Sequence, residues 1–140
     1  MQRTFTILKP DTVSAGRAGA VIAELEKAGF RIHAMKMVHL SEAQAQGFYH
    51  VHKDRPFFGS LVKFMTEGPI IAMVLESENA IEKLRRVMGA TDPGKADSGT
   101  IRKQFGSNIE RNAIHGSDGP DTAAFEISYF FNQLEIALGT

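Results

Sequence analysis

The stretch Ile70-Ile-Ala-Met-Val-Leu75 carries an apolar residue at every position. A strand with one face in solvent alternates apolar and polar residues, whereas this run is apolar on both faces, as expected of a buried central strand. Together with Pro69 it is the longest strongly apolar run in the chain, far short of the roughly 20 residues that span a bilayer. The run therefore predicts the central strand of a sheet.

Two more strands and a helix are predicted before this central strand. Residues 3–8 alternate apolar side chains with threonine, and Pro10 then ends the strand because proline cannot donate to a ladder. Apolar residues recur at helical spacing over 18–28, and Gly29 supplies the stop. Residues 30–40 alternate again and predict a long strand with one apolar side, made of Phe30, Ile32, Ala34, Val38 and Leu40.

Two short helices are predicted between the second strand and the central one. Ser41 and Gln44 have the spacing of a capping box, which opens a helix carrying Phe48 and Tyr49. Residues 57–65 follow Pro56 and form the second helix.

The region after the central strand predicts two helices separated by a long loop. The first covers 81–88 and is closed by Gly89. A glycine-rich polar stretch then runs to about Ile114, interrupted by a helical turn near 100–105. A short strand follows, and the last helix begins near Pro120, a residue favoured in a first turn, and continues to about 131.

This order of elements predicts an α+β fold. It is the ferredoxin-like βαββαβ sandwich, a four-stranded antiparallel sheet covered by helices, with a long loop before His115. A chain of 140 residues fits one domain, which we expect to cover 1–140. The same layout supports many functions, so the function has to be inferred from the site.

Composition excludes several classes of protein. The chain has no cysteine, which rules out disulfides, thiolate catalysis and cysteine zinc sites. Its 16 basic and 16 acidic residues cancel, so we expect no specific nucleic-acid partner and no membrane partner. Without a signal-peptide pattern at the start, a cytoplasmic location is expected.

His115 is the strongest candidate for chemistry. It lies where a short apolar step meets a Gly-Ser-Asp turn, at the end of a predicted strand. Glu126 follows inside the last helix, whose apolar face we assign to Ala124, Ile127 and Phe131. This carboxylate could bind one ring nitrogen and leave the other free as a nucleophile. Spacing alone leaves open a capped turn with a surface histidine.

Three cations from separate segments could converge on a phosphate chain. Lys9 ends the first strand, Arg85 lies in a helix and Arg102 lies in the helical turn. Arginine binds phosphate oxygens in pairs, and lysine acts as a point charge. Each residue taken singly is more often a solvated surface charge.

Two other patterns carry less weight. His50 and His52 could form half of a metal site, but no third ligand stands nearby in the sequence. The stretch from Gly89 to Ala96 has the glycine and lysine spacing of a P-loop, yet Ala96 replaces the serine or threonine that holds magnesium. The stretch also follows a predicted helix instead of a strand.

The chain resembles the nucleoside diphosphate kinase family over essentially its whole length. The most specific match is NAIHGSD at Asn112–Asp118, which is similar to the family's signature around its phosphorylated histidine. Four further matches occur in the same order as in the family: LKPD at 8–11, RPFF at 55–58, GATDP at 89–93 and GTIR at 99–102.

This resemblance implies a role for each matching position. His115 would be the nucleophile, oriented by Glu126 and Ser117, with Tyr49 lining the site beside it. Lys9 would contact phosphates and ribose, and Asn112 the sugar. The remaining nucleotide-binding positions would be Arg85, Thr91 and Arg102 on the phosphates, and Phe57, Leu61 and Ile109 around the base.

The resemblance also implies the reaction. The terminal phosphoryl group of a nucleoside triphosphate would pass to a nucleoside diphosphate by a ping-pong mechanism through phosphorylated His115. Broad base tolerance is expected because every base offers a π-face for stacking. Mg²⁺ would be held mainly by the nucleotide phosphates, without a metal site built by the protein. The family forms tetramers or hexamers, so a homo-oligomer is expected.

The sequence departs from the family pattern at two places. Asp92 stands where the family most often has asparagine and adds a negative charge near the loop, which would slightly weaken phosphate affinity, and Gly119-Pro120 also differs from the common pattern.

Two rival functions from other classes use the candidate site residues differently. A histidine phosphocarrier that passes its phosphoryl group to a partner protein would share His115 but would not need Phe57. A non-catalytic binding module would need none of these residues.

Overall fold

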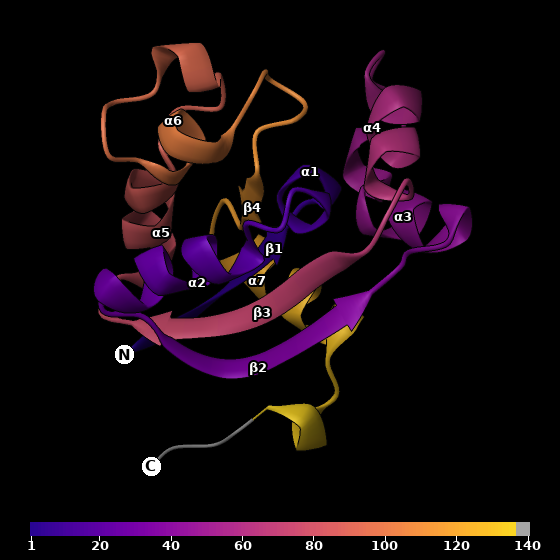
Figure 1. Ribbon diagram of the computed structural model, residues 1–140. Helices are drawn as coiled ribbons and strands as arrows, with labels where there is room; N and C mark the ends of the chain where they lie inside the picture. Colours follow the sequence, from indigo (N-terminus) through magenta and orange to yellow (C-terminus); the bar gives the residue numbers. More distant parts are fainter. Residues whose placement is uncertain (137–140) are drawn as a thin grey trace.

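The computed structural model describes residues 1–136, which are built on one four-stranded antiparallel sheet. Its strands are β1 (Gln2–Leu8), β2 (Arg31–Val38), β3 (Ile70–Ser77) and β4 (Ile114–Gly116). The strand order is β2-β3-β1-β4, and each neighbouring pair is antiparallel. This is the order of the predicted ferredoxin-like sandwich, with β3 and β1 at the centre (Figure 1).

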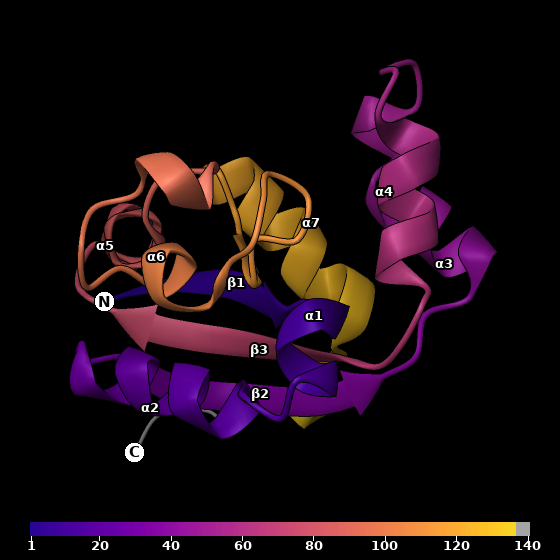
Figure 2. The same cartoon turned by 45° about the horizontal axis from the view of Figure 1, so that its top comes forward.

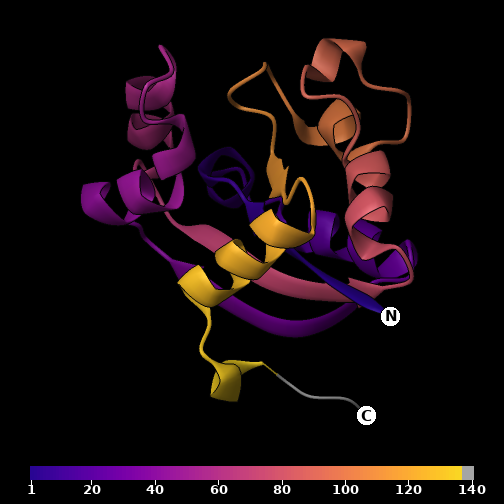
Figure 3. The ribbon, with the colours of Figure 1, turned by 180° about the vertical axis from the view of Figure 1, so that it is seen from behind.

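Helices cover both faces of the sheet. On one face lie α2 (Ala18–Lys27) and α5 (Ala80–Met88), while α7 (Pro120–Phe130) crosses the other, as Figures 1 and 3 show from opposite sides. The short helices α3 (Glu42–Phe48) and α4 (Phe58–Met65) stand together at one end of the sheet (Figure 2). The helix α6 (Ile101–Phe105) lies in the long loop before β4.

The central strand β3 contributes to two cores because alternate side chains point to opposite faces. Ile71, Met73 and Leu75 pack with α2 and α5. Their neighbours Ile70 and Val74 pack on the other face against residues of α3, α4 and α7. The prediction of a strand buried on both faces is confirmed.

The prediction of one apolar side for residues 30–40 is wrong because β2 contains a bulge. Ile32 pairs with Leu75 but Ala34 pairs with Val74, so His33 is an extra residue in the ladder. One inserted residue exchanges the two faces of everything that follows. Ile32 therefore packs toward α2 and α5, whereas Ala34 belongs to the opposite core. His33 is buried, with Nε2 lying 3.2 Å from Oε1 of Glu76.

One helix near the site is missing from the sequence prediction. The helix α1 (Pro10–Ser14) begins directly after β1, with Lys9 at its N-cap and Pro10 in its first turn. Pro10 ends the strand as expected, but its fixed φ also suits the start of a helix. The chain therefore turns sharply at Lys9 and carries Asp11 and Thr12 back toward β4.

The helix boundaries predicted from capping residues are close to those found. Ser41 accepts a hydrogen bond from the Gln44 N–H, and the Gln44 side chain accepts from Ser41, so the capping box is present. In α7 the buried face includes Ala123, Glu126 and Phe130. Ala124 is exposed, so its assignment to the apolar face is wrong by one position.

Within residues 1–136, no helix is both long and apolar enough to cross a bilayer.

Candidate active site

A cavity of about 550 Å³ lies between the end of β1, α3, α4, the long loop and α7. It gathers residues that are far apart in the sequence. Of the predicted site residues, eleven line it: Lys9, Tyr49, Phe57, Leu61, Arg85, Thr91, Arg102, Ile109, Asn112, His115 and Glu126. The twelfth, Ser117, is fully buried behind Glu126.

His115 is held in the middle of β4 by its backbone and its ring. It pairs with Ile7 in the sheet, and its carbonyl accepts a hydrogen bond of 2.7 Å from Oγ1 of Thr6. Its Nε2 lies 2.8 Å from Oε1 of Glu126. A carboxylate can only accept, so Nε2 carries the proton in the neutral ring and Nδ1 keeps its lone pair. The imidazole is therefore oriented as a nucleophile requires.

The carboxylate of Glu126 is itself fixed. The Ser117 hydroxyl donates to the same Oε1 at 2.7 Å, and Glu126 is only 9% exposed. A charged acceptor in such an environment binds its donors strongly. The chain Ser117–Glu126–His115 thus fixes both the tautomer and the angle of the ring.

Aromatic side chains surround the imidazole. Phe48 and Tyr49 meet the His115 ring edge-on, with centroids 5.6 and 6.3 Å away. Burial, followed by the nearby charge of Glu126, raises the pKa of Tyr49 above its usual range, so the phenol stays neutral. Its hydroxyl has no hydrogen-bond partner among residues 1–136. Tyr49 therefore narrows the space beside the histidine and leaves one donor available.

Lys9 brings a buried ammonium to the cavity. It is 7% exposed, and its Nζ donates to Oδ1 of Asn112 at 2.8 Å. Burial first, and repulsion from Arg102 second, lower the pKa of Lys9 to about 8. The nearby carboxylates of Asp11 and Glu110 offset this lowering only in part, and a poorly solvated cation of this kind favours an anionic ligand.

The two predicted arginines differ in how firmly they are held. Arg102 is 7% exposed and donates to the backbone carbonyls of Gly89 and Ile114, at 3.1 and 2.9 Å. Its Nε is buried without a partner in the described part of the chain. Burial and the neighbouring Arg85 lower the pKa of Arg102 to about 10. Arg85 is more exposed, and its Nη1 donates to Oδ1 of Asp118 at 2.8 Å.

Asn112 joins the lysine to the loop that carries Thr91. Its Oδ1 accepts from Lys9, while its Nδ2 donates to the Thr91 carbonyl at 3.0 Å. The Thr91 side chain is exposed. One amide therefore ties together β1, the loop after α5 and the approach to β4.

The opposite end of the cavity is apolar and open. Phe57 is 47% exposed and Ile109 is 63% exposed, while Leu61 is half-buried. The ring of Phe57 lies against His52, with centroids 5.6 Å apart. Neither Phe57 nor Ile109 belongs to a core cluster, so a flat group could contact both without displacing core side chains.

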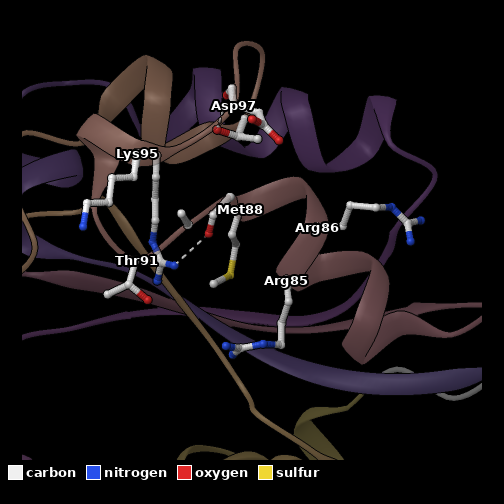
Figure 4. Close-up of a pocket in the computed structure, with 10 residues that line it drawn as sticks. Arg85, Arg86, Met88, Thr91, Lys95 and Asp97 are labelled. Carbon is white, nitrogen blue, oxygen red and sulfur yellow. Dashed lines mark hydrogen bonds between the residues drawn. The ribbon is translucent and has the colours of Figure 1, made fainter.

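A second, smaller cavity of about 360 Å³ shares Arg85, Thr91 and Arg102 with the first, and Figure 4 shows residues that line it. It includes Lys95, which the P-loop reading would place on phosphate. However, Gly89 directly follows a helix, and Pro93–Lys95 forms a 3₁₀ turn in which Asp92 accepts from the Gly94 N–H. A phosphate-binding P-loop follows a strand and leaves its N–H groups free, so this segment does not form one.

The structure adds residues that the sequence reasoning missed. Asp118 pairs with Arg85, and Thr6 holds the His115 carbonyl. Phe48, His52 and Glu110 also line the cavity. Asp118 could have been found, because it stands inside the NAIHGSD stretch; Thr6 carries no comparable sequence signal.

The described histidines and carboxylates do not gather into a metal site. Within 1–136, no group of three or more His, Asp or Glu side chains is arranged to hold a metal ion. Instead, Nδ1 of His50 donates to the Gly47 carbonyl, 3.1 Å away, and His52 packs on Phe57.

Comparison with known families gives one consistent result. A profile described as nucleoside diphosphate kinase matches residues 2–136. The nucleoside diphosphate kinase of Trichlorobacter lovleyi is 58% identical over 136 residues, covering 97% of this chain and 99% of that protein. That of an Anaeromyxobacter species is 60% identical over 135 residues, covering 96% of this chain and 92% of the relative.

Solved structures agree in fold. The Aquifex aeolicus nucleoside diphosphate kinase superposes with a TM-score of 0.95 at 43% identity, covering 97% of this chain and 99% of that one. A halophilic nucleoside diphosphate kinase from Halobacterium salinarum, solved in complex with CDP, gives 0.95 at 40% identity, with coverages of 99% and 93%.

Proposed function

The chain belongs to the nucleoside diphosphate kinase family, and we propose that His115 is the residue that carries the phosphoryl group between nucleotides. Its activity is that family's transfer from a nucleoside triphosphate to a nucleoside diphosphate. The observation that supports the role of His115 is its geometry. Nε2 is held by Glu126 at 2.8 Å, and the ring lines the same cavity as Lys9, Arg85 and Arg102.

Two displacements at phosphorus complete the reaction. The Nδ1 lone pair forms a bond to the γ-phosphorus, and the bond from this phosphorus to the β–γ bridging oxygen breaks, so the diphosphate leaves with that electron pair. The phosphorylated ring then carries positive charge, which Glu126 stabilises at Nε2. A terminal oxygen of a second diphosphate attacks the same phosphorus, and the N–P bond breaks to restore neutral His115. Ser117 and Glu126 act as orienting groups throughout.

The three cations bind the phosphate chain. Arg102, fixed by two carbonyls, meets the phosphates with little reorganisation, which is the arrangement that best stabilises transferring charge. Lys9 supplies a point charge beside it, and Arg85 and Thr91 contact the outer phosphates. A bound triphosphate would also offset the repulsion between Lys9 and Arg102.

The apolar end of the cavity accepts the base. We propose that the base stacks on Phe57 and touches Leu61 and Ile109, while Lys9 and Asn112 contact the ribose. Stacking and apolar contact do not read hydrogen-bond patterns, so all common bases are tolerated. Tyr49 excludes water beside the histidine and can donate its free hydroxyl to the transferring group.

Mg²⁺ enters as part of the substrate, bound to the triphosphate. Lys9, Arg85 and Arg102 line the cavity and fit a metal-bound triphosphate, which remains anionic. When bound, the ion would neutralise charge on the leaving diphosphate, while Arg85, Thr91 and Arg102 would hold the phosphates that carry it.

We also propose a homo-oligomer, a tetramer or hexamer, of chains that each form one domain over 1–140 in the cytoplasm. The outer edge of β2 is unpaired in the described sheet, and Met35 and Met37 on this strand are 54% and 62% exposed. An open edge with apolar side chains suits a subunit contact. Light scattering at micromolar concentration should give four or six chains; a monomer would contradict this proposal.

Incubation with Mg-ATP followed by intact mass spectrometry tests the central role of His115. Wild type should gain one phosphoryl group that acid removes and base leaves in place, and His115→Ala should gain none and lose turnover. Adding GDP should then discharge the adduct as GTP. An adduct on serine, or an active His115→Ala enzyme, would overturn the mechanism. Discharge only to another protein would favour the phosphocarrier alternative.

A further inference from the structure

The backbone directly before His115 makes a strained turn. Ala113 has φ +76°, a conformation that residues with a Cβ rarely adopt. The Ile114 N–H donates to the Asn112 carbonyl at 2.9 Å, which closes a three-residue turn around Ala113. A γ-turn with positive φ at its centre is the rarer and strained form. Such a conformation persists only where its surroundings impose it.

Three hydrogen bonds to the end of β1 and to α1 hold the carbonyl and the N–H of Ala113. The Ala113 carbonyl accepts from the Lys9 N–H at 2.9 Å and from Oγ1 of Thr12 at 3.0 Å. The Ala113 N–H donates to Oδ2 of Asp11 at 3.0 Å. The carbonyl thus has two donors, whereas the N–H depends on one carboxylate.

Asp11 is therefore the less replaceable of these partners. Ala113 is fully buried, so loss of the carboxylate would leave its N–H without solvent or a second acceptor within the described residues. An unpaired buried N–H costs more than the bond itself contributes. The turn would then relax toward negative φ, which removes the strain of the Cβ.

Relaxation of this turn would move the site residues on both sides of Ala113. Asn112 precedes Ala113 and binds Lys9, while Ile114 and His115 follow it in β4, paired with Leu8 and Ile7. We propose that Asp11 is a positioning residue for phosphoryl transfer, which holds the strained turn at Ala113 and thereby fixes His115 relative to Lys9 and Asn112. This inference rests on the proposed role of His115.

The test measures the rate of His115 phosphorylation by saturating Mg-ATP with rapid quenching, on protein shown to be folded by circular dichroism. Asp11→Ala should slow this step on the order of 10²-fold, the loss expected from a displacement of about 1 Å. Asp11→Asn keeps an oxygen acceptor for the Ala113 N–H and should stay within about fivefold of wild type. Thr12→Val is the matched control, because the carbonyl that it releases keeps the Lys9 N–H; it should stay within about threefold.

A second substitution addresses the strain itself. Glycine adopts positive φ without a Cβ penalty, so Ala113→Gly in the Asp11→Ala background should recover at least about tenfold of the lost rate. A purely stabilising role of Asp11 would lower Tm and leave the rate of the folded enzyme unchanged, which would overturn the proposal. Equal losses in Asp11→Asn and Asp11→Ala would assign the effect to the negative charge that Asp11 places near Lys9, and this result would also overturn the proposal. A wild type that forms no phosphohistidine would contradict the proposed function instead.

Discussion

The two ends of the 550 Å³ cavity are built in opposite ways. At the proposed phosphate end, Lys9 and Arg102 are each 7% exposed, and their positions are fixed by hydrogen bonds to Asn112 and to two backbone carbonyls. At the proposed base end, Phe57 is 47% exposed and Ile109 is 63% exposed. Charge stabilisation requires donors that are already in place, whereas stacking requires only a surface. Substitutions at the phosphate end should therefore reduce turnover, and those at the base end should weaken binding.

The largest loss of turnover is expected when Arg102 or Arg85 is replaced. Arg102→Ala should lower kcat by about 10²–10³, because a fixed donor to the transferring group is lost. Arg85→Ala should fall at the lower end of this range, since its side chain is 45% exposed and paired with Asp118. Steady-state kinetics with saturating Mg-ATP and GDP measures both.

Arg86→Ala is the matched control for the arginines, since Arg86 is directed away from Arg85 and Thr91 in Figure 4. It should leave kcat within about twofold of wild type, as expected for a solvated surface charge. Near-normal rates in both Arg85→Ala and Arg102→Ala would place the phosphate clamp elsewhere.

Two lysines compare a buried charge in the 550 Å³ cavity with an exposed charge in the 360 Å³ cavity. Lys9→Ala should lower kcat/KM at least about tenfold, because a buried charge beside the phosphates disappears. Lys95→Ala removes the same charge from an exposed position in the other cavity and should cost less than about threefold. Circular dichroism of both variants checks that they are folded. If Lys95→Ala is inactive while Lys9→Ala and His115→Ala are active, the histidine mechanism is wrong.

The pH dependence of kcat/KM should report the ionisation of Lys9 in the free enzyme. The pKa of Lys9 is lowered to about 8, so its ammonium is retained below pH 8 and lost above it. As kcat/KM reports ionisations of the free enzyme, it should fall toward the Lys9→Ala value as the pH rises through 8. Lys9→Arg keeps its charge over this range, so the fall near pH 8 should disappear even if its overall rate is reduced. A wild-type profile that stays flat up to pH 10 would mean that Lys9 does not titrate there.

The smallest effect is expected at the base end. Phe57→Ala should raise KM about fivefold, near the lower limit of about 1 kcal/mol for one stacked base, and should leave kcat unchanged. ATP and GTP should act as donors within about tenfold of each other, before and after the substitution. A preference of several thousandfold for one base would reveal a hydrogen bond that reads the base.

Local signals in the sequence were sufficient for most secondary structure. The apolar run 70–75, the capping box at Ser41 and the positions of Gly29, Gly89 and Pro120 each act on neighbouring residues, so their effects can be read directly from the chain. The sheet order followed from the order of these elements. The motif around His115 identified the family by resemblance, before any residue could be placed in space.

The errors arose where pairing between distant segments decides the outcome. The bulge at His33 depends on how β2 meets β3, and it reverses the faces of Ala34 and the residues after it. Nothing in the alternation of residues 30–40 shows this, because register is set by the partner strand. The displaced face of α7, with Ala123 buried in place of Ala124, follows from how the helix is rotated against the sheet.

The sequence alone determined which residue types are present for the chemistry: a histidine beside a Gly-Ser-Asp turn, a carboxylate in the following helix and cations in three segments. Only the tertiary structure decided which of them are buried, paired or free. Arg85 and Arg102 look alike in the sequence, yet one is exposed and the other is held by two carbonyls. Asp11 obtains its partner only because α1 folds back against the turn at Ala113. Burial and hydrogen bonding belong to contacts between segments, and these form only when the whole sheet is assembled.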